Sequence, residues 1–589
     1  MGNIMEYCPY LTPRPGQNKA IPEIKKALDD GVLFTFLYAP TGAGKSGIAR
    51  TITDYFGAKG MPSFIGTKTK DLQKQYIEGV HASNDYCLHF EKIVGRNNFK
   101  CNLLTDPTTN LTVTCDNGLC RSVDWVKAKI NKDRETLDLF KLRDGSHCWE
   151  SCEYRKALQV FKKCDVGICN YDILLNDSLY AHNYPERRIL ICDEAHNLID
   201  KLREFSKLTI NLNTINSKLS YQTPNEKHPF NIHALLNYKY DGYVFEDEFD
   251  WLNIPDFLRD YYESDYKDSI LESFDDNLKE SAPTISRIES FLNKLDMKRT
   301  QVMNNQSNYV FEDFENKEGN KISCSFTPIK IDKGASDLIF QKGLQIILMS
   351  ASFTNPEFYV QLLSLNENEY RIITVPEERN LKKINPCYYH NCGKMSAYKR
   401  KETFPKICSK ISEIMNYPQN KDKKGVIHVP TYKCGEYLIK NLDNPRLIFH
   451  KNKNEKDKII REFKQSKEPL ILVSPTSFEG VDFPYDNCRF QILTCLPVPP
   501  FNNFYKTLQK ENPEEARMMV ATKLVQLLGR GCRASDDYCE NHLLDNRFTS
   551  CCSYDGNTLL QPRDLPKPIR DCFKGSQPWK YWNKQGVKL

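Results

Sequence analysis

The chain has 589 residues, of which 40% are hydrophobic and 27% are charged, and its formal net charge is +6. This composition is ordinary for a water-soluble globular protein, and the length predicts about three or four domains whose cores need no disulfide bonds. No apolar run of roughly eighteen residues occurs, and no basic segment with an apolar core opens the chain. A membrane span and a secretory signal are therefore not expected.

The 22 cysteines bear on the compartment and on metal binding. A long, enzyme-like chain without a secretory signal is expected in the cytoplasm, or in the nucleus of a eukaryote, where thiols stay reduced. A local cluster of cysteines in such a chain indicates a metal site rather than a disulfide framework. The modest positive charge permits nucleic-acid binding through a local basic groove but does not require it.

The first elements lead into a phosphate-binding loop. A helix is expected over residues 21–28, and strands over 32–38 and 62–65. The segment APTGAGKS (39–46) approximates the P-loop pattern, with Ala39 where the first glycine usually stands. Its glycines let backbone amides converge on phosphate oxygens, while the lysine and the hydroxyl that follow suit the β- and γ-phosphates and Mg²⁺. The expected nucleotide-binding residues are Thr41, Gly42, Gly44, Lys45 and Ser46.

Residues 87–152 break this pattern with cysteines, glycines and polar turns, which predicts an inserted, metal-dependent lobe. The strand-like segments VGICNY (166–171) and RRILIC (187–192) resume the regular pattern, and the second enters DEAH. Carboxylates at the carboxyl end of a parallel strand lie where such a sheet binds its ligands. We expect Asp193 to hold Mg²⁺ through water and Glu194 to orient and deprotonate the attacking water.

The rest of the chain predicts a second insertion and a second α/β domain. Residues 205–335 are acidic, aromatic and mostly helical in pattern, strand 344–349 ends in Ser-Ala-Ser, and a polar linker lies near 376–383. The apolar segments KGVIHVP, RLIFH, EPLILVSP and RFQILTCLP then alternate with helical stretches. Such alternation is typical of a parallel sheet covered on both faces, so the predicted fold class is α/β with two domains, the first interrupted twice.

A third catalytic element is sought in QLLGRGCR (526–533), which supplies Gln526, Arg530 and Arg533. Phosphoryl transfer gains from arginines that meet the charge of the transition state. If the segment is helical, its two arginines are three residues apart and share one face. The segment by itself also fits a basic surface helix.

Taken in order, these segments resemble those of superfamily 2 helicases of the XPD/DinG group. RPGQ (14–17) resembles the element in which a glutamine, here Gln17, reads adenine. The other resemblances are GTKTKDLQKQ to motif Ia, DEAHNL to motif II, SAS to motif III, HVPTYK (428–433) to motif IV, SFEGVDFP (477–484) with CLPVPP to motif V, and QLLGRGCRASDD to motif VI.

The resemblance implies two RecA-like P-loop domains that close on ATP and Mg²⁺, with Arg530 and Arg533 arriving from the second domain. His196 and Asp482 join the expected nucleotide-binding set, and Glu479, Gly480 and Asp482 would link domain motion to the bound strand. Domain 1 is expected at residues 1–86, 160–205 and 335–375, the iron–sulfur lobe at 87–159, a helical arch-like insertion at 206–334, and domain 2 at 380–589.

GRNNFKC (95–101) and CEYRKAL, which begins at Cys152, resemble the entry to and the exit from the family's iron–sulfur domain. The resemblance implies a 4Fe–4S cluster on four thiolates, for which we select Cys101, Cys120, Cys148 and Cys152, with Cys115 as the alternative to Cys120. A zinc site built on the close pairs Cys115/Cys120 and Cys148/Cys152 remains open. Lys92, Arg96, Phe99 and Lys100 fit either a strand-lining surface or a solvated face. Cys192, Cys551 and Cys552 are expected to be ordinary thiols.

The predicted function is an ATP-dependent DNA helicase that acts as a monomer on single-stranded and forked DNA, with the 5′ to 3′ polarity that the resemblance implies. One alternative is a translocase that acts on R-loops, RNA or protein-bound strands. Another is a non-catalytic nucleic-acid-binding module, against which the intact phosphate loop, DEAH and arginines argue. A P-loop kinase or a transporter ATPase has no place for the later motifs. No membrane association is expected, and protein partners are not readable from the sequence.

Overall fold

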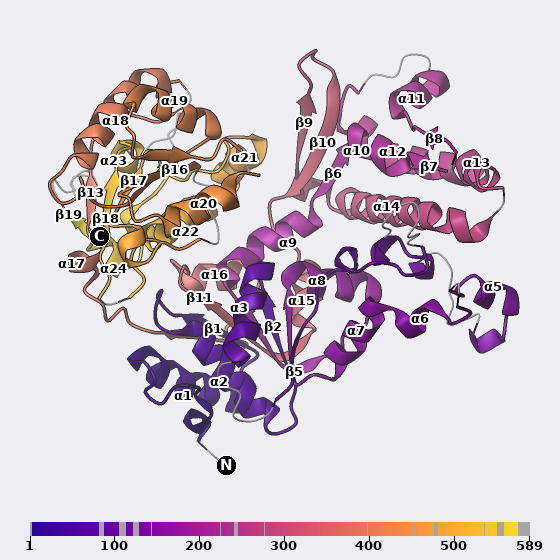
Figure 1. Ribbon diagram of the computed structural model, residues 1–589, viewed down its shortest axis with the longest axis horizontal. Helices are drawn as coiled ribbons and strands as arrows, with labels where there is room; N and C mark the ends of the chain where they lie inside the picture. Colours follow the sequence, from indigo (N-terminus) through magenta and orange to yellow (C-terminus); the bar gives the residue numbers. More distant parts are fainter. Residues whose placement is uncertain are drawn as a thin grey trace. The chain divides into compact units, whose positions relative to one another are not determined.

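The computed structural model describes residues 3–81, 88–104, 114–121, 129–142, 144–223, 225–240, 245–275, 277–396, 398–452, 454–475, 481–534, 536–550 and 559–574 (Figure 1). The chain divides into two compact units. Unit 1 comprises Met1–Ile52, Asp193–His196 and Ile347–Leu589, and unit 2 comprises Thr53–Cys192 and Asn197–Ile346. No helix among the described residues is both long and apolar enough to cross a membrane.

The first seven-stranded sheet has the strand order β12-β1-β11-β5-β2-β4-β3. Its strands are β1 (Phe34–Tyr38), β2 (Ser63–Thr67), β3 (Phe90–Lys92), β4 (Val166–Asn170), β5 (Arg187–Asp193), β11 (Gly343–Ser350) and β12 (Tyr370–Thr374). The pairs β1–β12, β2–β4, β2–β5 and β3–β4 are parallel. Helices α1 (Pro15–Asp29), α2 (Lys45–Gly57) and α3 (Lys70–His81) belong to this part of the fold. The continuous apolar runs of the sequence correspond to strands that are almost wholly buried.

The second seven-stranded sheet lies within unit 1 and has the order β15-β16-β14-β17-β18-β13-β19. All six neighbouring pairs are parallel. Its strands are β13 (Cys387–Tyr389), β14 (Gly425–Val429), β15 (Leu447–Phe449), β16 (Ile471–Pro475), β17 (Phe490–Leu493), β18 (Glu540–Leu543) and β19 (Phe573–Lys574). The two parallel sheets confirm the predicted α/β class.

Alternation along each strand sends side chains into two cores, one on each face of the second sheet. Ile427 and Val473 pack with α18 (Arg400–Met415) and α19 (Tyr432–Leu442). The neighbouring residues Val426 and Leu472 pack with α20 (Lys456–Gln465). Further along that second face, α22 (Pro513–Leu528) packs on Leu493 and Leu543. This helix leads directly into the predicted motif VI.

The cysteine-rich insertion in unit 2 has little regular structure and a small core. It contains the short helices η3 (Cys115–Asn117), η4 (Leu119–Arg121), α5 (Arg134–Asp138) and α6 (Cys148–Ser151), and then α7 (Glu153–Lys163). Leu119 and Phe140 pack with Ala282 of α14 (Leu278–Asn304), a long helix of the second insertion.

The second insertion is mostly helical, as expected, but it also carries an antiparallel sheet that the sequence analysis did not include. Its helices are α10 (Leu212–Leu219), α11 (Ile232–Tyr240), α12 (Glu248–Tyr261), α13 (Lys267–Ser273) and α14. Three strands pair in the order β6 (Leu208–Asn211), β10 (Lys321–Pro328) and β9 (Tyr309–Glu315). A single large core around Trp251 joins the helices to this sheet.

Candidate functional site

The phosphate loop leaves the sheet after Tyr38 and ends where α2 begins at Lys45. Gly42 and Gly44 have φ angles of 88° and 86°, a conformation that residues with a side chain rarely adopt. Lys45 is half-buried and Ser46 is exposed, so both are open to a ligand at the first turn of the helix. The loop therefore has the backbone curl and the helix N-terminus that bind phosphate.

Two residues before the loop hold its shape. Gln17 is fully buried; its amide nitrogen donates to the Gly44 carbonyl at 3.1 Å, and its oxygen accepts from the Arg14 backbone at 2.9 Å. Arg14 Nη1 donates to the Gly42 carbonyl. Gln17, which the resemblance predicts to bind adenine, thus also holds the loop backbone at Gly44.

The acidic motif begins at the last residue of β5, Asp193. Its carboxylate accepts a hydrogen bond from the Glu194 backbone at 2.9 Å, and Glu194 has a φ of 52°. A left-handed conformation in a non-glycine residue stores strain of the kind found at functional sites. His196 Nδ1 lies 2.7 Å from Ser350 Oγ and 3.3 Å from a Glu194 oxygen. This histidine therefore joins the DEAH segment to the Ser-Ala-Ser segment that ends β11.

Motif VI approaches these residues within unit 1. Helix α22 carries Gln526, whose amide is hydrogen-bonded to His196 Nε2. The helix ends at Leu528, so Arg530 and Arg533 follow it and do not share a helical face. A Cβ built on Gly42 would lie 2.9 Å from the Arg533 carbonyl oxygen, which puts the motif VI backbone against the phosphate loop.

The two arginines have different partners. The Arg530 side chain is buried and donates to the Val481 carbonyl at 2.8 Å. Arg533 forms an ion pair with Asp482. Burial, together with the nearby Arg379 guanidinium, lowers the pKa of Arg533 to about 10, although Glu194 opposes the shift. Arg533 is thus the motif VI arginine whose charge interacts with the acidic motif, and its backbone carbonyl lies beside the loop. Glu479 and Gly480 lie outside the described residues.

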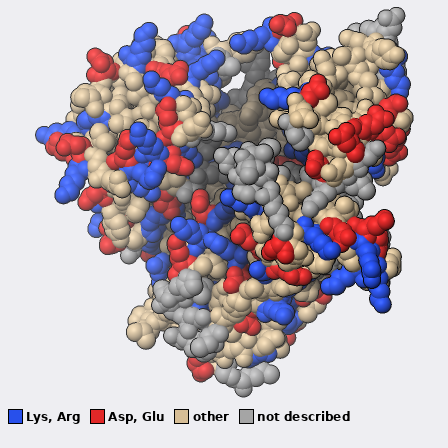
Figure 2. Space-filling view, turned by 45° about the vertical axis from the view of Figure 1, so that its right-hand side comes forward, with Lys and Arg blue, Asp and Glu red and all other residues tan. Residues whose placement is uncertain are grey.

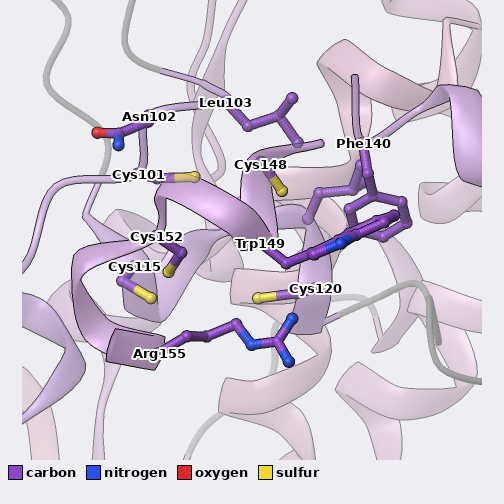
Figure 3. A pocket seen from close by; sticks show the side chains of 11 residues that line it. Cys101, Asn102, Leu103, Cys115, Cys120, Phe140, Cys148, Trp149, Cys152 and Arg155 are labelled. Atoms are coloured by element: carbon purple, nitrogen blue, oxygen red, sulfur yellow. The ribbon is translucent and has the colours of Figure 1, made fainter. Parts of the chain in front are cut away.

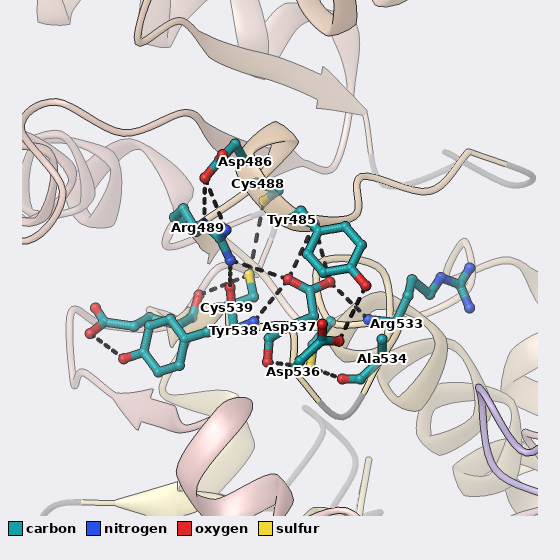
Figure 4. Close-up of polar contacts among 12 residues, drawn as sticks. Tyr485, Asp486, Cys488, Arg489, Arg533, Ala534, Asp536, Asp537, Tyr538 and Cys539 are labelled. Atoms are coloured by element: carbon teal, nitrogen blue, oxygen red, sulfur yellow. Dashed lines mark hydrogen bonds and ion pairs between the residues drawn. The ribbon is translucent and has the colours of Figure 1, made fainter.

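A buried carboxylate that sequence reasoning did not single out shapes the motif VI segment (Figure 4). Asp537 is fully buried and accepts from the backbone amides of Arg533 and Tyr485, each at 3.1 Å, and of Tyr538 at 2.8 Å. Arg489 Nη1 donates to it at 3.2 Å. A charge with this many hydrogen-bond donors is stable in the interior, and it fixes the backbone from which the Arg533 side chain extends. Its only sequence signal was its place at the end of the QLLGRGCRASDD segment.

The five lobe cysteines from Cys101 to Cys152 line one cavity (Figure 3). Cys115 is buried and Cys120 is exposed, while Cys101, Cys148 and Cys152 are intermediate. Hydrogen bonds from Cys115 to Cys120 and Cys152 raise the pKa of Cys115, and its bond to Cys152 lowers the pKa of that thiol to about 6. Asn102, Leu103, Leu119, Phe140, Trp149 and Arg155 complete the lining.

Within the described residues no group of three or more candidate ligands already has the arrangement of a metal-binding group. The donor set of the cavity nonetheless suits thiolate ligation, because five cysteine side chains line it. A Cβ built on Gly118 would lie 3.5 Å from the Cys101 sulfur and 3.7 Å from the Cys120 sulfur. Glycine therefore keeps the space between these two sulfurs open.

The expected strand-lining residues of the lobe fall into two groups. The Arg96 guanidinium lies 4.7 Å from the ring centre of Tyr154, and the Phe99 ring meets the same tyrosine at 5.4 Å. Lys92 and Lys100 are exposed. Two of the four residues thus pack within unit 2, and two face solvent. Cys192 is buried, as expected, whereas Cys551 and Cys552 lie outside the described residues.

Two family matches cover separate parts of the chain. Residues 71–215 match the family described as DEAD_2, and residues 414–557 match the family described as the helicase C-terminal domain. A curated relative, "ATP-dependent DNA helicase CHL1" of Vanderwaltozyma polyspora, is 28% identical over 158 residues. That alignment covers 21% of this chain and 19% of the relative, so the chain spans only a fifth of that protein.

Solved structures share the fold over almost the whole chain. A structure titled "XPD_Helicase" has a TM-score of 0.57 at 17% identity and covers 92% of this chain and 97% of its own. "Structure of S. tokodaii Xpd4" has a TM-score of 0.50 at 15% identity and covers 93% of this chain and 99% of its own. At such low identity the likeness concerns the fold alone.

Proposed function

We propose that this chain, which belongs to the XPD/DinG-like superfamily 2 helicases, is an ATP-driven motor that moves 5′ to 3′ on single-stranded DNA and opens forked duplexes. One observation carries the proposal. Within unit 1 the phosphate loop, the DEAH segment and motif VI meet, through the Gln526–His196 hydrogen bond and the close approach of the Arg533 backbone to Gly42. A static phosphate-binding protein has no need of that third element.

ATP hydrolysis at this site is a direct displacement at the γ-phosphorus. Glu194 takes a proton from the attacking water, the bond from the γ-phosphorus to the bridging oxygen breaks, and ADP leaves with that oxygen. Lys45 neutralises the β- and γ-phosphates, and Ser46 and Asp193 would hold Mg²⁺, which screens the same charge. Gln17 and Thr41 would bind the remainder of the nucleotide.

Arg533 acts by changing partners. In the structure it is paired with Asp482, which neutralises the guanidinium. A triphosphate at the loop offers more negative charge than one carboxylate, and arginine binds phosphate through two parallel hydrogen bonds. Nucleotide binding would then release Asp482 from Arg533. Because Asp482 belongs to motif V, its release would change the segment that is expected to bind the strand.

The proposed motor domains follow the expected boundaries. Residues 1–86, 160–205 and 335–375 form the first, and residues 380–589 form the second. His196 is hydrogen-bonded to Ser350 of the Ser-Ala-Ser segment and to Gln526 of motif VI. Loss of the γ-phosphate beside the acidic motif would therefore change contacts in all three motifs. Such coupling requires an element with two discrete arrangements, and the Arg533 ion pair supplies one.

The iron–sulfur cluster is a second part of the proposal. Cys101, Cys120, Cys148 and Cys152 would hold 4Fe–4S, with Cys115 as the alternative to Cys120, since Cys115 is the buried one of the two. A 4Fe–4S cluster cross-links a lobe whose own core is small and so stabilises its fold. Zinc on the two close cysteine pairs is the competing assignment.

The strand path is supported by a second cavity within unit 2, of about 380 Å³. It lies among Val94, Arg96 and Tyr154 of the lobe, Tyr180 and Tyr184 after α8 (Tyr171–Asn176), and Ser286, Asn293 and Lys294 of α14. Two carboxylates, Asp177 and Glu289, also line it, so the aromatic rings and amide groups suit bases of a single strand, and phosphates would lie at Arg96 and Lys294. On the face drawn in Figure 2, acidic and basic side chains are interspersed, so charge alone marks no groove there.

The nucleotide assignment is tested by Lys45→Ala. We expect the variant to lose ATP hydrolysis by at least about 100-fold while keeping most of its single-strand affinity, because the lysine serves the phosphates and not the strand. The measurement is phosphate release with and without single-stranded DNA, paired with strand binding by fluorescence anisotropy. Turnover at the wild-type rate would remove the nucleotide site from this loop.

The direction and the substrate are tested with 5′-tailed and 3′-tailed DNA and RNA duplexes, using the wild-type protein and Lys45→Ala as the inactive control. We expect displacement of the 5′-tailed DNA only. ATP hydrolysis stimulated by single strands without displacement of any duplex would favour the alternative, a translocase that remodels R-loops or protein-bound strands. Equal displacement of RNA duplexes would remove the preference for DNA.

The cluster is tested by Cys152→Ser, with Cys8→Ser as the control because Cys8 does not line the lobe cavity. The lobe variant is expected to lose iron and its absorbance near 400 nm and to unwind poorly, yet to keep ATP hydrolysis. Iron content and absorbance of anaerobically purified protein check this. A colourless wild-type protein that contains zinc would replace the cluster by the zinc assignment.

A further inference from the structure

Another arginine, Arg379, lies beside the phosphate loop, and none of the motifs contains it. Strands β1 and β12 are parallel neighbours, with Tyr38 opposite Thr374, and the Val375 amide donates to the Tyr38 carbonyl at 2.8 Å. The chain after β12 therefore leaves the sheet at the same edge as the phosphate loop. Four residues beyond Val375, Arg379 reaches the loop: a Cβ built on Gly42 would lie 3.8 Å from Arg379 Nη1.

Arg379 is held in one orientation by a neighbouring carboxylate. Its Nε donates to Glu377 Oε1 at 2.8 Å and its Nη2 donates to Oε2 at 2.7 Å, a two-bonded arrangement that fixes the plane of the guanidinium. The side chains of Arg379 and Glu377 are only 13% and 6% exposed. Such a buried, charge-balanced pair keeps its geometry before any ligand arrives.

This arrangement leaves one nitrogen unsatisfied. Arg379 Nη1 is buried and has no hydrogen-bond partner among the described residues. A buried donor without a partner costs roughly 1–3 kcal/mol, and such a group in a native structure calls for a ligand or a water. The Arg379 charge also adds to that of Arg533, since it helps to lower the pKa of that residue. Arg379 and Arg533 therefore bring positive charge to the loop from the segment after β12 and from motif VI.

We propose that Arg379 contacts the phosphate chain of the nucleotide bound at the loop, as a third cation beside Lys45 and Arg533. This inference rests on the proposed ATPase function and adds a binding residue to it. Glu377 balances the charge of Arg379 and fixes its guanidinium with Nη1 near the loop, so the arginine needs little reorganisation to bind a phosphate oxygen. Lysine cannot reproduce this, because it lacks the fork that binds the carboxylate and a phosphate at once.

The test compares Arg379→Gln and Arg379→Lys with Arg371→Gln. Arg371 is a matched control, since it stands on β12, pairs with Asp30 at 2.8 Å and is more exposed. Binding of ATPγS with Mg²⁺, ADP and adenosine to the full chain is measured by isothermal titration calorimetry. We expect Arg379→Gln to weaken ATPγS binding by roughly 10- to 100-fold and Arg379→Lys by less, with adenosine binding unchanged. Arg371→Gln should bind all three like the wild type.

The ligand series separates contact with phosphate from a structural role. Equal loss for adenosine and ATPγS, or unchanged ATPγS binding in both Arg379 variants, would overturn the inference while leaving the ATPase intact. If Arg379→Gln does not fold, Arg379→Lys alone decides, because it keeps the charge and loses only the fork. Failure of the wild type to bind ATPγS would instead remove the nucleotide site itself, and this inference with it.

Discussion

At the residue scale, Gly42 separates two effects of adding a side chain. Its φ is 88°, and a Cβ there would meet the Arg533 carbonyl oxygen at 2.9 Å. Gly60 has a similar φ of 70° but nothing within 4 Å of its Cβ position. Alanine at either position costs about 1 kcal/mol of backbone strain. Only at position 42 must the motif VI backbone also move away from the loop.

We therefore expect Gly42→Ala to lose ATP hydrolysis by at least about 10-fold and Gly60→Ala to retain it. The melting temperature of Gly60→Ala should fall by about as much as that of Gly42→Ala, because both variants carry the same backbone strain. Phosphate release and thermal unfolding of the two variants check this pair. Equal turnover in both would mean that close contact between Arg533 and the loop is not needed for hydrolysis. The expectation is specific to the backbone, since Gly42 has no side chain to lose.

The candidate site could be predicted where residues follow one another in a fixed pattern. The loop at 39–46 and the acidic motif at 193–196 follow buried strands, as their patterns predicted. Arg379 and Asp537 could not be found in the same way, because each acts on residues far away in the sequence or on backbone amides, and neither contact leaves a local pattern. The roles of the predicted residues stay predictions until the variants are measured.

At the element scale, one buried ion pair holds the segment after α8 to the residue that precedes β11. Lys342 Nζ lies 2.7 Å from Asp177 Oδ2 and donates to the Tyr184 carbonyl at 3.1 Å. The Lys342 and Asp177 side chains are 6% and 4% exposed, and Asp177 also accepts from the Asn183 and Tyr184 amides. Removing one partner of such a pair leaves a buried charge, which costs more than the pair itself contributes.

Lys342→Ala is expected to lower the free energy of unfolding by about 3 kcal/mol. The control is Lys201→Ala, whose partner Asp172 is 49% exposed, so that the loss stays below about 1 kcal/mol. Urea unfolding followed by circular dichroism measures both. Similar midpoints for the two variants would contradict the burial argument. Because Asp177 and Tyr184 also line the larger cavity of unit 2, Lys342→Ala should weaken strand binding as well.

Elements were predictable where hydrophobic runs were strong. The strands at 34–38, 63–67, 166–170 and 187–193 lie where apolar segments predicted them, because strands buried on both faces have continuous apolar sequences. The antiparallel pair β9–β10 was not predicted, although Gly319, with a φ of 83°, marks its turn. In β9 the acidic Glu312 is buried and Phe314 is exposed, the reverse of the alternation that predicts a half-buried strand, and the helical segments around the pair dominated the composition.

At the scale of the whole molecule, both parallel sheets depend on segments distant in sequence. The first sheet gathers strands from Phe34 to Thr374 around two insertions, and the second gathers strands from Cys387 to Lys574. The alternation of strands and helices predicted this class, but strand order is set by packing and crossover connections rather than by local sequence. Because each sheet is held together by contacts between strands distant in sequence, a single buried group between two strands can change its stability.

His428 is such a group. It lies on β14, is fully buried, and its Nε2 shares a hydrogen bond of 3.1 Å with Gln491 on β17. Burial, aided by the positive charge of Arg530 and opposed by the bond to Gln491, lowers its pKa to about 4. In the unfolded chain the pKa of histidine is about 6.5. Between about pH 4 and pH 6.5, His428 is therefore protonated in the unfolded state and neutral in the folded state.

Stability from this group is fully present above about pH 6.5 and is lost as the pH falls toward 4, by up to about 1.4 kcal/mol per pH unit. Urea midpoints at pH 7.5, 6.5, 5.5 and 4.5 should fall more steeply in the wild type than in His428→Gln. The measured quantity is the difference between the wild type and His428→Gln in the slope of urea midpoint against pH. Carboxylates contribute equally to the slope of both proteins, so this difference isolates His428. His233→Gln, at an exposed position, should keep the wild-type slope. Parallel slopes for the wild type and His428→Gln would mean that His428 accepts its proton without unfolding the sheet.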